Sequence, residues 1–131
     1  MDAIFFKLFL GHLLGDYGLQ PKKMAYLKSD SGWKGFWVCT LHSLIYTLCI
    51  ALFVWRFDLM FLSLIFLTHW PIDRYSLASK WLDLIKGRTF MEAYGSKDPF
   101  REFDVGFTCI VYERVDMMFH FILMYLIILI F

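Results

Sequence analysis

Residues 10–19 of the chain read LGHLLGDYGL, in which His12 and Asp16 lie four residues apart inside an otherwise apolar segment. On a helix, residues i and i+4 lie on the same face, so this spacing presents an imidazole and a carboxylate side by side. The same pairing recurs in FLTHWPIDRY and ERVDMMFHFIL, and a fourth histidine lies in VCTLHSLIYT. The residues concerned are His69 and Asp73, Asp116 and His120, and His42.

The composition predicts that these pairs lie on membrane helices. Of the 131 residues, 60% are hydrophobic, whereas about 45–50% is usual in soluble domains. Four apolar segments, at residues 3–19, 35–55, 59–77 and 105–131, approach the roughly 20 residues that cross a bilayer. We therefore predict an all-α fold, an integral membrane four-helix bundle that forms a single domain over residues 1–131. A short amphipathic helix around residues 80–86 is expected in the loop between helices 3 and 4.

The basic residues predict the orientation of this bundle. They gather in the two long connecting segments, and the cytoplasmic loops of membrane proteins carry an excess of Lys and Arg. Both long loops are therefore expected to be cytoplasmic and both termini outside, in a multi-pass protein of the inner (cytoplasmic) membrane. The residues are Lys22, Lys23, Lys28, Lys34, Lys80, Lys86, Arg88, Lys97 and Arg101.

The same loops give the depth of the ionisable residues. His12 lies 10 residues before Lys22, and His42 lies 8 residues after Lys34. His69 lies 11 residues before Lys80. At a rise of about 1.5 Å per helical residue, these histidines share one layer in the cytoplasmic half of the membrane. Ionisable groups at membrane depth are costly and are functional candidates for that reason.

Metal binding is the chemistry that best fits this layer. Zinc binds imidazole nitrogen and carboxylate oxygen, and manganese and iron are alternatives. The number of ligands suits one well-supported ion or two adjacent ions. A proton relay or a hydrogen-bonded lock between helices would use the same residues. The predicted ligands are His12, Asp16, His42, His69, Asp73, Asp116 and His120; among them Asp16, Asp73 and Asp116 are also the candidate catalytic bases.

Residues near this layer are candidates for substrate binding. Gln20 extends the row of His12 and Asp16 by one turn, and Arg74 and Arg114 flank Asp73 and Asp116. The two guanidinium groups are suited to an anionic head group or phosphate. Snorkelling of both arginines to the membrane interface is an equally good reading.

Two other features bear on how the helices pack. Pro71 lies between His69 and Asp73 and is expected to kink the third helix, which would weaken the i,i+4 geometry of that pair. The spacing of Gly11 and Gly15 allows another helix to approach closely.

Several short motifs resemble those of a family of small bacterial and phage membrane proteins of unknown function. They are His-Leu-Leu-x-Asp-x-x-x-Gln from His12 to Gln20, a central His42, and the later His-x-x-x-Asp and Asp-x-x-x-His. More remotely, the chain is similar to inner-membrane proteins classed as metal-dependent hydrolases, which also carry His-x-x-x-Asp on membrane helices. Of their His-Arg-x-x-Thr-His-Ser signature it keeps only Thr40, His42 and Ser43.

These observations favour a membrane-embedded, divalent-metal-dependent hydrolase, with a lipid or isoprenoid phosphate ester as the expected substrate and membrane lipid as its surroundings. A proton- or metal-coupled transporter or channel subunit is the first alternative, and it would require a homo-oligomer or a partner chain. A non-catalytic phage or bacterial membrane interaction protein is the second. No nucleic acid is expected as a partner, since the chain has no basic arm; its formal net charge of +1 argues neither for nor against one.

Overall fold

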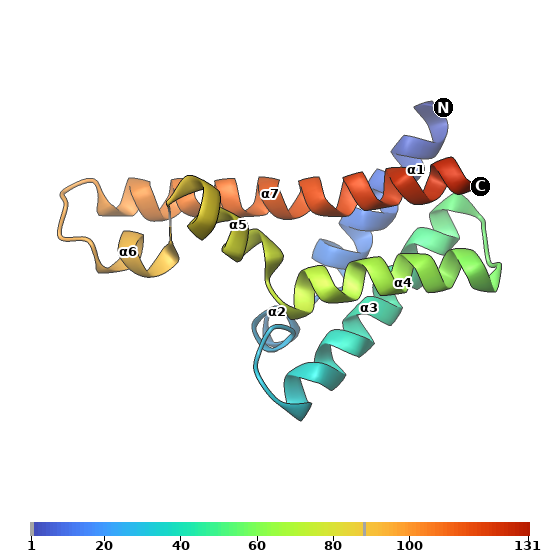
Figure 1. Ribbon diagram of the computed structural model, residues 1–131, viewed down its shortest axis with the longest axis horizontal. Coiled ribbons are helices and arrows are strands. Elements are labelled where there is room, and N and C mark those ends of the chain that lie inside the picture. Colours follow the sequence, from blue (N-terminus) through green and yellow to red (C-terminus); the bar gives the residue numbers. More distant parts are fainter. Residues whose placement is uncertain (1, 88) are drawn as a thin grey trace.

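The computed structural model describes residues 2–87 and 89–131, and all its regular elements are helical (Figure 1). Arg88, one of the basic residues behind the predicted orientation, lies outside the described residues. The all-α prediction is confirmed for the described residues. In chain order the elements are α1 (Asp2–Leu13), the π-helical turn η1 (Leu14–Gly18), α2 (Lys22–Leu27), α3 (Trp33–Val54), α4 (Leu59–Arg74), α5 (Leu77–Lys86), α6 (Phe90–Gly95) and α7 (Arg101–Ile130).

The four predicted apolar segments correspond to α1 with η1, α3, α4 and α7. Among the described residues, α3 alone is long and apolar enough to cross a membrane by length and composition. The helices α1 and α4 have 12 and 16 residues, and α7 has charged residues along its first half. The arrangement with four membrane spans therefore stays a prediction.

One buried cluster joins these four helices. Both termini and the α3–α4 link lie at the same end of the molecule (Figure 1). Toward that end, side chains from all four helices pack together with almost no exposed surface. Removal of such apolar area from water contributes about 25 cal/mol per Å² to stability. The cluster consists of Leu8, Tyr46, Ile50, Phe61, Ile65, Met124 and Ile127.

Close packing of α1 against α3 depends on two glycines. A Cβ atom at Gly11 would lie 3.1 Å from the Cα of Ile50, and one at Gly15 would lie 2.9 Å from Cδ2 of Tyr46. A side chain at either position would push the two backbones apart. The close approach predicted from the spacing of Gly11 and Gly15 is confirmed, and it brings His12 and Asp16 next to α3.

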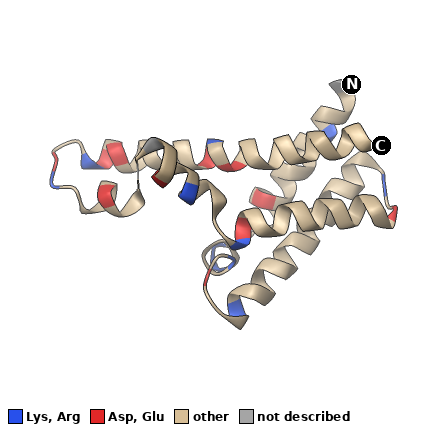
Figure 2. Ribbon diagram, in the orientation of Figure 1, with Lys and Arg blue, Asp and Glu red and all other residues tan. Residues whose placement is uncertain are grey.

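The N-terminal half of α7 extends beyond this core and is covered by α5 and α6 (Figure 1). Ala78 and Leu82 of α5 bury their side chains against Val115 of α7. The helix α5 corresponds to the short amphipathic helix expected between helices 3 and 4. Figure 2 shows charged residues on α5, α6, the first half of α7 and around α2, whereas α3 and α4 carry them only near their ends.

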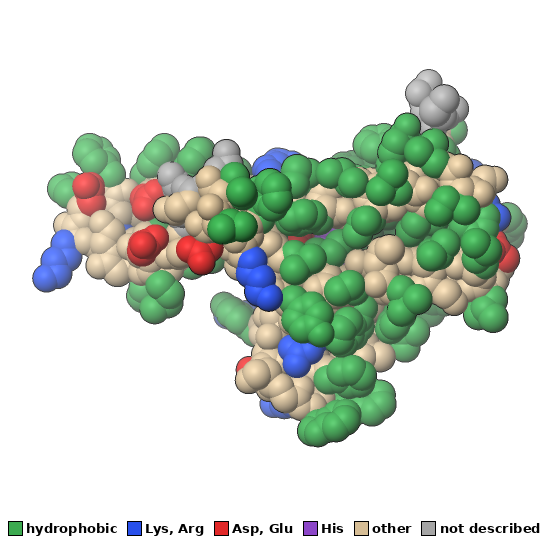
Figure 3. Space-filling model, viewed as in Figure 1, with side chains coloured by type: hydrophobic (Ala, Val, Ile, Leu, Met, Phe, Trp, Pro, Cys, Tyr) green, Lys and Arg blue, Asp and Glu red, His purple; other side chains and the backbone are tan. Residues whose placement is uncertain are grey.

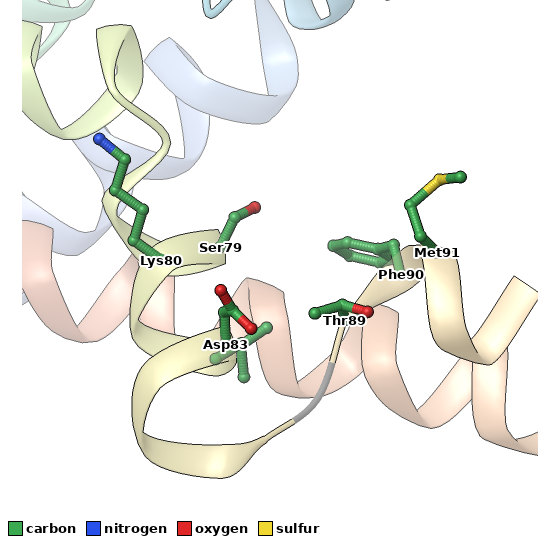
Figure 4. A pocket seen from close by; sticks show the side chains of 7 residues that line it. Ser79, Lys80, Asp83, Thr89, Phe90 and Met91 are labelled. Carbon is green, nitrogen blue, oxygen red and sulfur yellow. The ribbon is translucent and has the colours of Figure 1, made fainter.

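The short helix α6 has no counterpart in the sequence prediction, although its first turn has a recognisable cap. The Thr89 hydroxyl accepts from the Glu92 amide at 3.1 Å and donates to the Glu92 carboxylate at 2.9 Å. A hollow of about 300 Å³ lies between α5 and α6, with Lys80 and Asp83 on one side and Phe90 and Met91 on the other (Figure 4). None of the predicted site residues lines it.

Candidate metal centre

Four helices bring the predicted ligands into one buried group, named here the His/Asp cluster. All four histidines are at most 2% exposed, and Asp16 and Asp73 are also buried. Asp116 is partly buried, with 17% of its side chain exposed. The members are His12 and Asp16 from α1 and η1, His42 from α3, His69 and Asp73 from α4, and Asp116 and His120 from α7.

The first pair is set by the π-helical turn that continues α1. Nδ1 of His12 lies 3.4 Å from Oδ2 of Asp16. The amide of Leu19 donates to the carbonyl of Leu14 at 2.9 Å, which is the i→i+5 hydrogen bond of a π turn. Such turns are rare and frequently mark functional sites. Here the widened turn carries the carboxylate of Asp16 toward α3.

The second pair is intact in spite of Pro71. The helix α4 continues through this proline to Arg74, and Nε2 of His69 lies 3.1 Å from Oδ2 of Asp73. The expectation that Pro71 would weaken this pair is therefore wrong. A proline removes its own N–H and crowds the carbonyl four residues before it. The turn that follows keeps its hydrogen bonds, such as that from the Tyr75 amide to the Pro71 carbonyl at 3.1 Å.

The third pair, on α7, is looser. Nδ1 of His120 lies 2.8 Å from the backbone carbonyl of Asp116 and 3.5 Å from its Oδ2. A hydrogen bond from Nδ1 to this carbonyl would fix the imidazole so that Nε2 is the free nitrogen. That arrangement is common among metal-binding histidines, whose second nitrogen is held by a carbonyl or carboxylate.

His42 lies between the first two pairs. Its Nε2 is 3.0 Å from Oδ1 of Asp16 and 2.9 Å from Oδ2 of Asp73. The amide of Gln20 is 3.2 Å from the ring nitrogens of His42. With its oxygen turned toward His42, this amide also accepts from Nζ of Lys28 at 3.0 Å. Gln20 is therefore in contact with the cluster. The sequence analysis had placed it next to the cluster, one turn beyond Asp16.

Tyr46 is a member of this environment that the sequence analysis did not identify. Its hydroxyl lies 3.2 Å from Nδ1 of His12 and 3.3 Å from Sδ of Met124. Its ring stacks on the ring of His69 with centroids 3.7 Å apart. Tyr46 lies one helical turn after His42, so the i,i+4 rule that found the pairs would also have found it.

The cluster leaves several buried nitrogen atoms without a hydrogen-bond partner among the described residues. They include Nε2 of His12, Nδ1 of His69 and Nε2 of His120. Buried polar atoms are nearly always paired, because an unpaired one loses its solvation without compensation. A divalent cation bound by these nitrogens would remove that cost.

Three sets of residues have ligand atoms that all lie within 4.8 Å of one another. Asp16, Asp73 and His120 each belong to two of the three sets. A single carboxylate could therefore bind two neighbouring ions. Imidazole and carboxylate donors suit zinc, and also manganese and iron. The sets are Asp16 with His42, His69 and Asp73; His12 with Asp16 and His120; and Asp73 with Asp116 and His120.

Lys28 supplies the cluster with a positive charge. Its Nζ lies 2.9 Å from Oδ2 of Asp73 and 3.9 Å from Oδ1 of Asp16, with only 14% of the side chain exposed. Burial lowers the pKa of Lys28, but the attraction of Asp73 and Asp16 outweighs it and raises the pKa to about 12. The sequence analysis used Lys28 only as an indicator of orientation. The need of buried carboxylates for a counter-charge was the signal that could have identified it.

The two predicted arginines contact groups outside the cluster. The guanidinium of Arg74 donates to the carbonyls of Asp30 at 2.6 Å and Gly32 at 3.4 Å, which ties α4 to the loop before α3. The side chain of Arg114 is 68% exposed and lies 3.9 Å from the carboxylate of Glu113. Their role in substrate binding stays a prediction.

A cavity of about 240 Å³ leads from the surface to the cluster. Its polar wall includes Asp16, Gln20, Lys28 and Asp116. Tyr17 and Tyr112 also line it, and the Tyr17 hydroxyl donates to the carboxylate of Glu113 at 3.3 Å. Among the members of the cluster, Asp16 and Asp116 are the two that face this opening.

Comparison with known proteins gives the family of the chain. Residues 4–131 match the family described as "Protein of unknown function (DUF3307)", and the chain belongs to this family. No curated protein matches it, and no solved structure does. The expected membership of a family of unknown function is confirmed, while the remote similarity to hydrolases stays a prediction.

Proposed function

We propose that this member of the family is a membrane-embedded, divalent-metal-dependent hydrolase that acts on a lipid or isoprenoid phosphate ester. The observation that carries the proposal is the His/Asp cluster, in which four helices converge and buried imidazole nitrogens have no partner among the described residues. A helix lock would be expected to pair these nitrogens with one another or with the carboxylates.

The ligands of the metal would be drawn from the seven residues of the cluster, with zinc as the first candidate and manganese or iron as alternatives. When bound, one or two such ions would lower the pKa of a water molecule and polarise a phosphoryl oxygen. The protein itself contributes a dry, rigid surrounding, since Tyr46 packs on His69 and holds His12. Rigid support of this kind keeps the ligands in their geometry.

Asp116 is the best candidate for the general base. It faces the open cavity and is the most exposed carboxylate of the cluster. Asp73 is engaged by His42, His69 and Lys28, whereas the carboxylate of Asp116 has the longer 3.5 Å contact with His120. Asp116 is therefore free to accept a proton from a water molecule in the cavity.

The apolar surface supports a membrane location. Leu41, Leu44, Leu48 and Leu52 form a stripe along α3, each about half exposed. Figure 3 shows apolar side chains gathered over the part of the molecule that holds α3 and α4, with charged ones mainly at the other end. A monomeric soluble protein rarely exposes a large contiguous apolar patch. In the proposed topology the basic loops are cytoplasmic and both termini are outside, and the assembly could be a homo-oligomer.

Phosphate release from a lipid phosphate is the direct test of the function. Detergent-solubilised protein, loaded with zinc or manganese, is expected to hydrolyse phosphatidate or an isoprenoid phosphate, and His42→Ala is expected to abolish the activity. The exposed variant Leu44→Ala, on the same helix, is the control. If His42→Ala retained the full hydrolytic activity, the proposal would be contradicted. Metal flux through liposomes without hydrolysis would favour a transporter instead.

Substitution of Lys28 gives a separate prediction about metal affinity. The ammonium group of Lys28 lies against two carboxylates that a metal would use, so it competes with a bound cation. Lys28→Met is expected to raise the affinity for the metal at least about tenfold. Unit charges interact by about 4 kcal/mol at 4 Å and an effective dielectric constant of about 20, and relief of about 1.4 kcal/mol of this repulsion already corresponds to tenfold. Metal titration followed by calorimetry measures this. Lys22→Met, on the exposed side of α2, is the matched control, and equal affinities in all three proteins would refute the competition.

A further inference from the structure

An apolar groove outside the His/Asp cluster runs between α1 and the C-terminal half of α7. It has a volume of about 320 Å³, and its walls are almost entirely hydrophobic. Ile4 and Leu129 line it near the two termini, and Leu8 and Phe121 line it deeper in the fold. The proposed hydrolysis does not by itself require this groove.

The inner end of the groove lies next to the cluster, with the ring of Phe121 between the groove and His12. Leu8 lies one helical turn before His12 on α1, and Phe121 follows His120 on α7. The ring of Phe121 is also in contact with the ring of His12, with centroids 5.0 Å apart. The groove thus ends beside His12 and His120, two of the three histidines whose Nε2 atoms are buried without a hydrogen-bond partner among the described residues.

We propose that this groove binds the hydrocarbon chain of the substrate while its phosphate lies at the cluster. The inference rests on the proposed function and deepens it, since it assigns the substrate to the long-chain class. An occupant of this groove must be apolar along its length and polar at the end near His12 and His120. A lipid phosphate has both properties, and a groove that runs along two helices matches an extended chain.

The proposed membrane topology agrees with this orientation of the substrate, with its phosphate at the cluster and its chain in the groove. His12 is expected in the cytoplasmic half of the membrane, and the groove runs from it toward the outside termini. A lipid of the cytoplasmic leaflet has its head group at that surface and its chains pointing to the middle of the bilayer. Its chain therefore enters the groove in the correct orientation. Because the bilayer is as apolar as the groove, close packing against the groove walls, and not transfer from water, would favour binding of the chain.

Groove-filling variants test this inference by direct binding as well as by turnover. Ile4→Trp and Leu129→Trp place a large ring in the groove at positions remote from the cluster. Leu48→Trp, at an exposed position on α3, is the matched control. The probes are a fluorescent long-chain phosphatidate for binding, and dioleoyl phosphatidate and glycerol phosphate for hydrolysis by the metal-loaded protein.

Both groove variants are expected to lower the affinity for the long-chain probe and kcat/KM for dioleoyl phosphatidate at least about tenfold, a change of about 1.4 kcal/mol, because the added ring takes the space of the chain. Their activity on glycerol phosphate and their metal content should equal those of the control. Long-chain binding that is equal in all variants, or an equal loss with both substrates, would overturn the groove assignment. Chain-dependent binding without any hydrolysis would keep the groove and reject the proposed function instead.

Discussion

Removal of the metal by a chelator is expected to lower the melting temperature of the wild-type protein by about 10 °C, and His69→Ala/Asp73→Ala should abolish this response. A ligand at about 100 times its dissociation constant stabilises a fold by about 2.7 kcal/mol, which corresponds to a shift of this size in a chain of this length. His69 and Asp73 belong to the set with the most buried candidate ligands. The measurement is thermal unfolding in detergent with and without chelator.

The loss of packing in the double variant must be separated from the loss of metal. Ile65→Ala is the control, because Ile65 is buried on α4 one turn before His69 and lies in the apolar core. It is expected to lower the melting temperature by itself but to keep the full response to chelator. A wild-type protein with no response, or a double variant with an undiminished one, would contradict the metal assignment.

Asp116→Asn is expected to lower kcat at least about 100-fold, because a positioned general base typically contributes a factor of 10²–10⁴. The amide of asparagine keeps the size of the side chain but cannot accept the proton. At least one ion should stay bound, since the set of Asp16, His42, His69 and Asp73 does not include Asp116. The measurement is phosphate release under saturating substrate, with metal content determined on the same samples.

Glu113→Gln is the matched control for this variant. Glu113 is a carboxylate on α7 that lines the same cavity, but it contacts Tyr17 rather than an imidazole. Its replacement is expected to change kcat less than about threefold, within the range of a surface contact. An equal loss in both variants would assign the effect to the charge of the cavity and not to a base at position 116.

Much of the cluster could be predicted because its members follow helix periodicity. His12 and Asp16, and likewise His69 and Asp73, are four residues apart, and their positions relative to the basic loops gave a common depth. Tyr46 also follows this rule, since it lies four residues after His42. It was not predicted as part of the cluster because a tyrosine in an apolar helix is ordinarily a core residue. The chain therefore encodes the cluster locally, turn by turn, and long-range packing only brings the turns together.

Other features depend on tertiary contacts that the periodicity does not contain. Lys28 lies outside the apolar segments, and its position against Asp73 results from the path of the loop between α2 and α3. The π turn at η1 has no sequence signal that distinguishes it from a regular turn. Pro71 was misjudged for a local reason, because the crowding falls on the preceding turn and leaves the side chains of His69 and Asp73 aligned.

The two short helices give a similar contrast. The sequence predicts α5 through its amphipathic pattern, and it contains the Thr89 and Glu92 cap of α6, although that cap was not used as a start signal. The number of membrane spans is harder to predict, since α1 and α4 are shorter than a full crossing, and within residues 2–87 and 89–131 only α3 has both the length and the apolar character.

Elemental analysis of the purified protein by inductively coupled plasma mass spectrometry tests the central claim most directly. The wild-type protein is predicted to contain one or two equivalents of zinc, manganese or iron. His69→Ala/Asp73→Ala is predicted to lose at least one equivalent, while Ile65→Ala retains the wild-type content. Absence of metal from the wild-type protein, even after reconstitution with each ion, would contradict the account. The His/Asp cluster would then be a proton relay or a lock between helices, and the hydrolase proposal would fall with it.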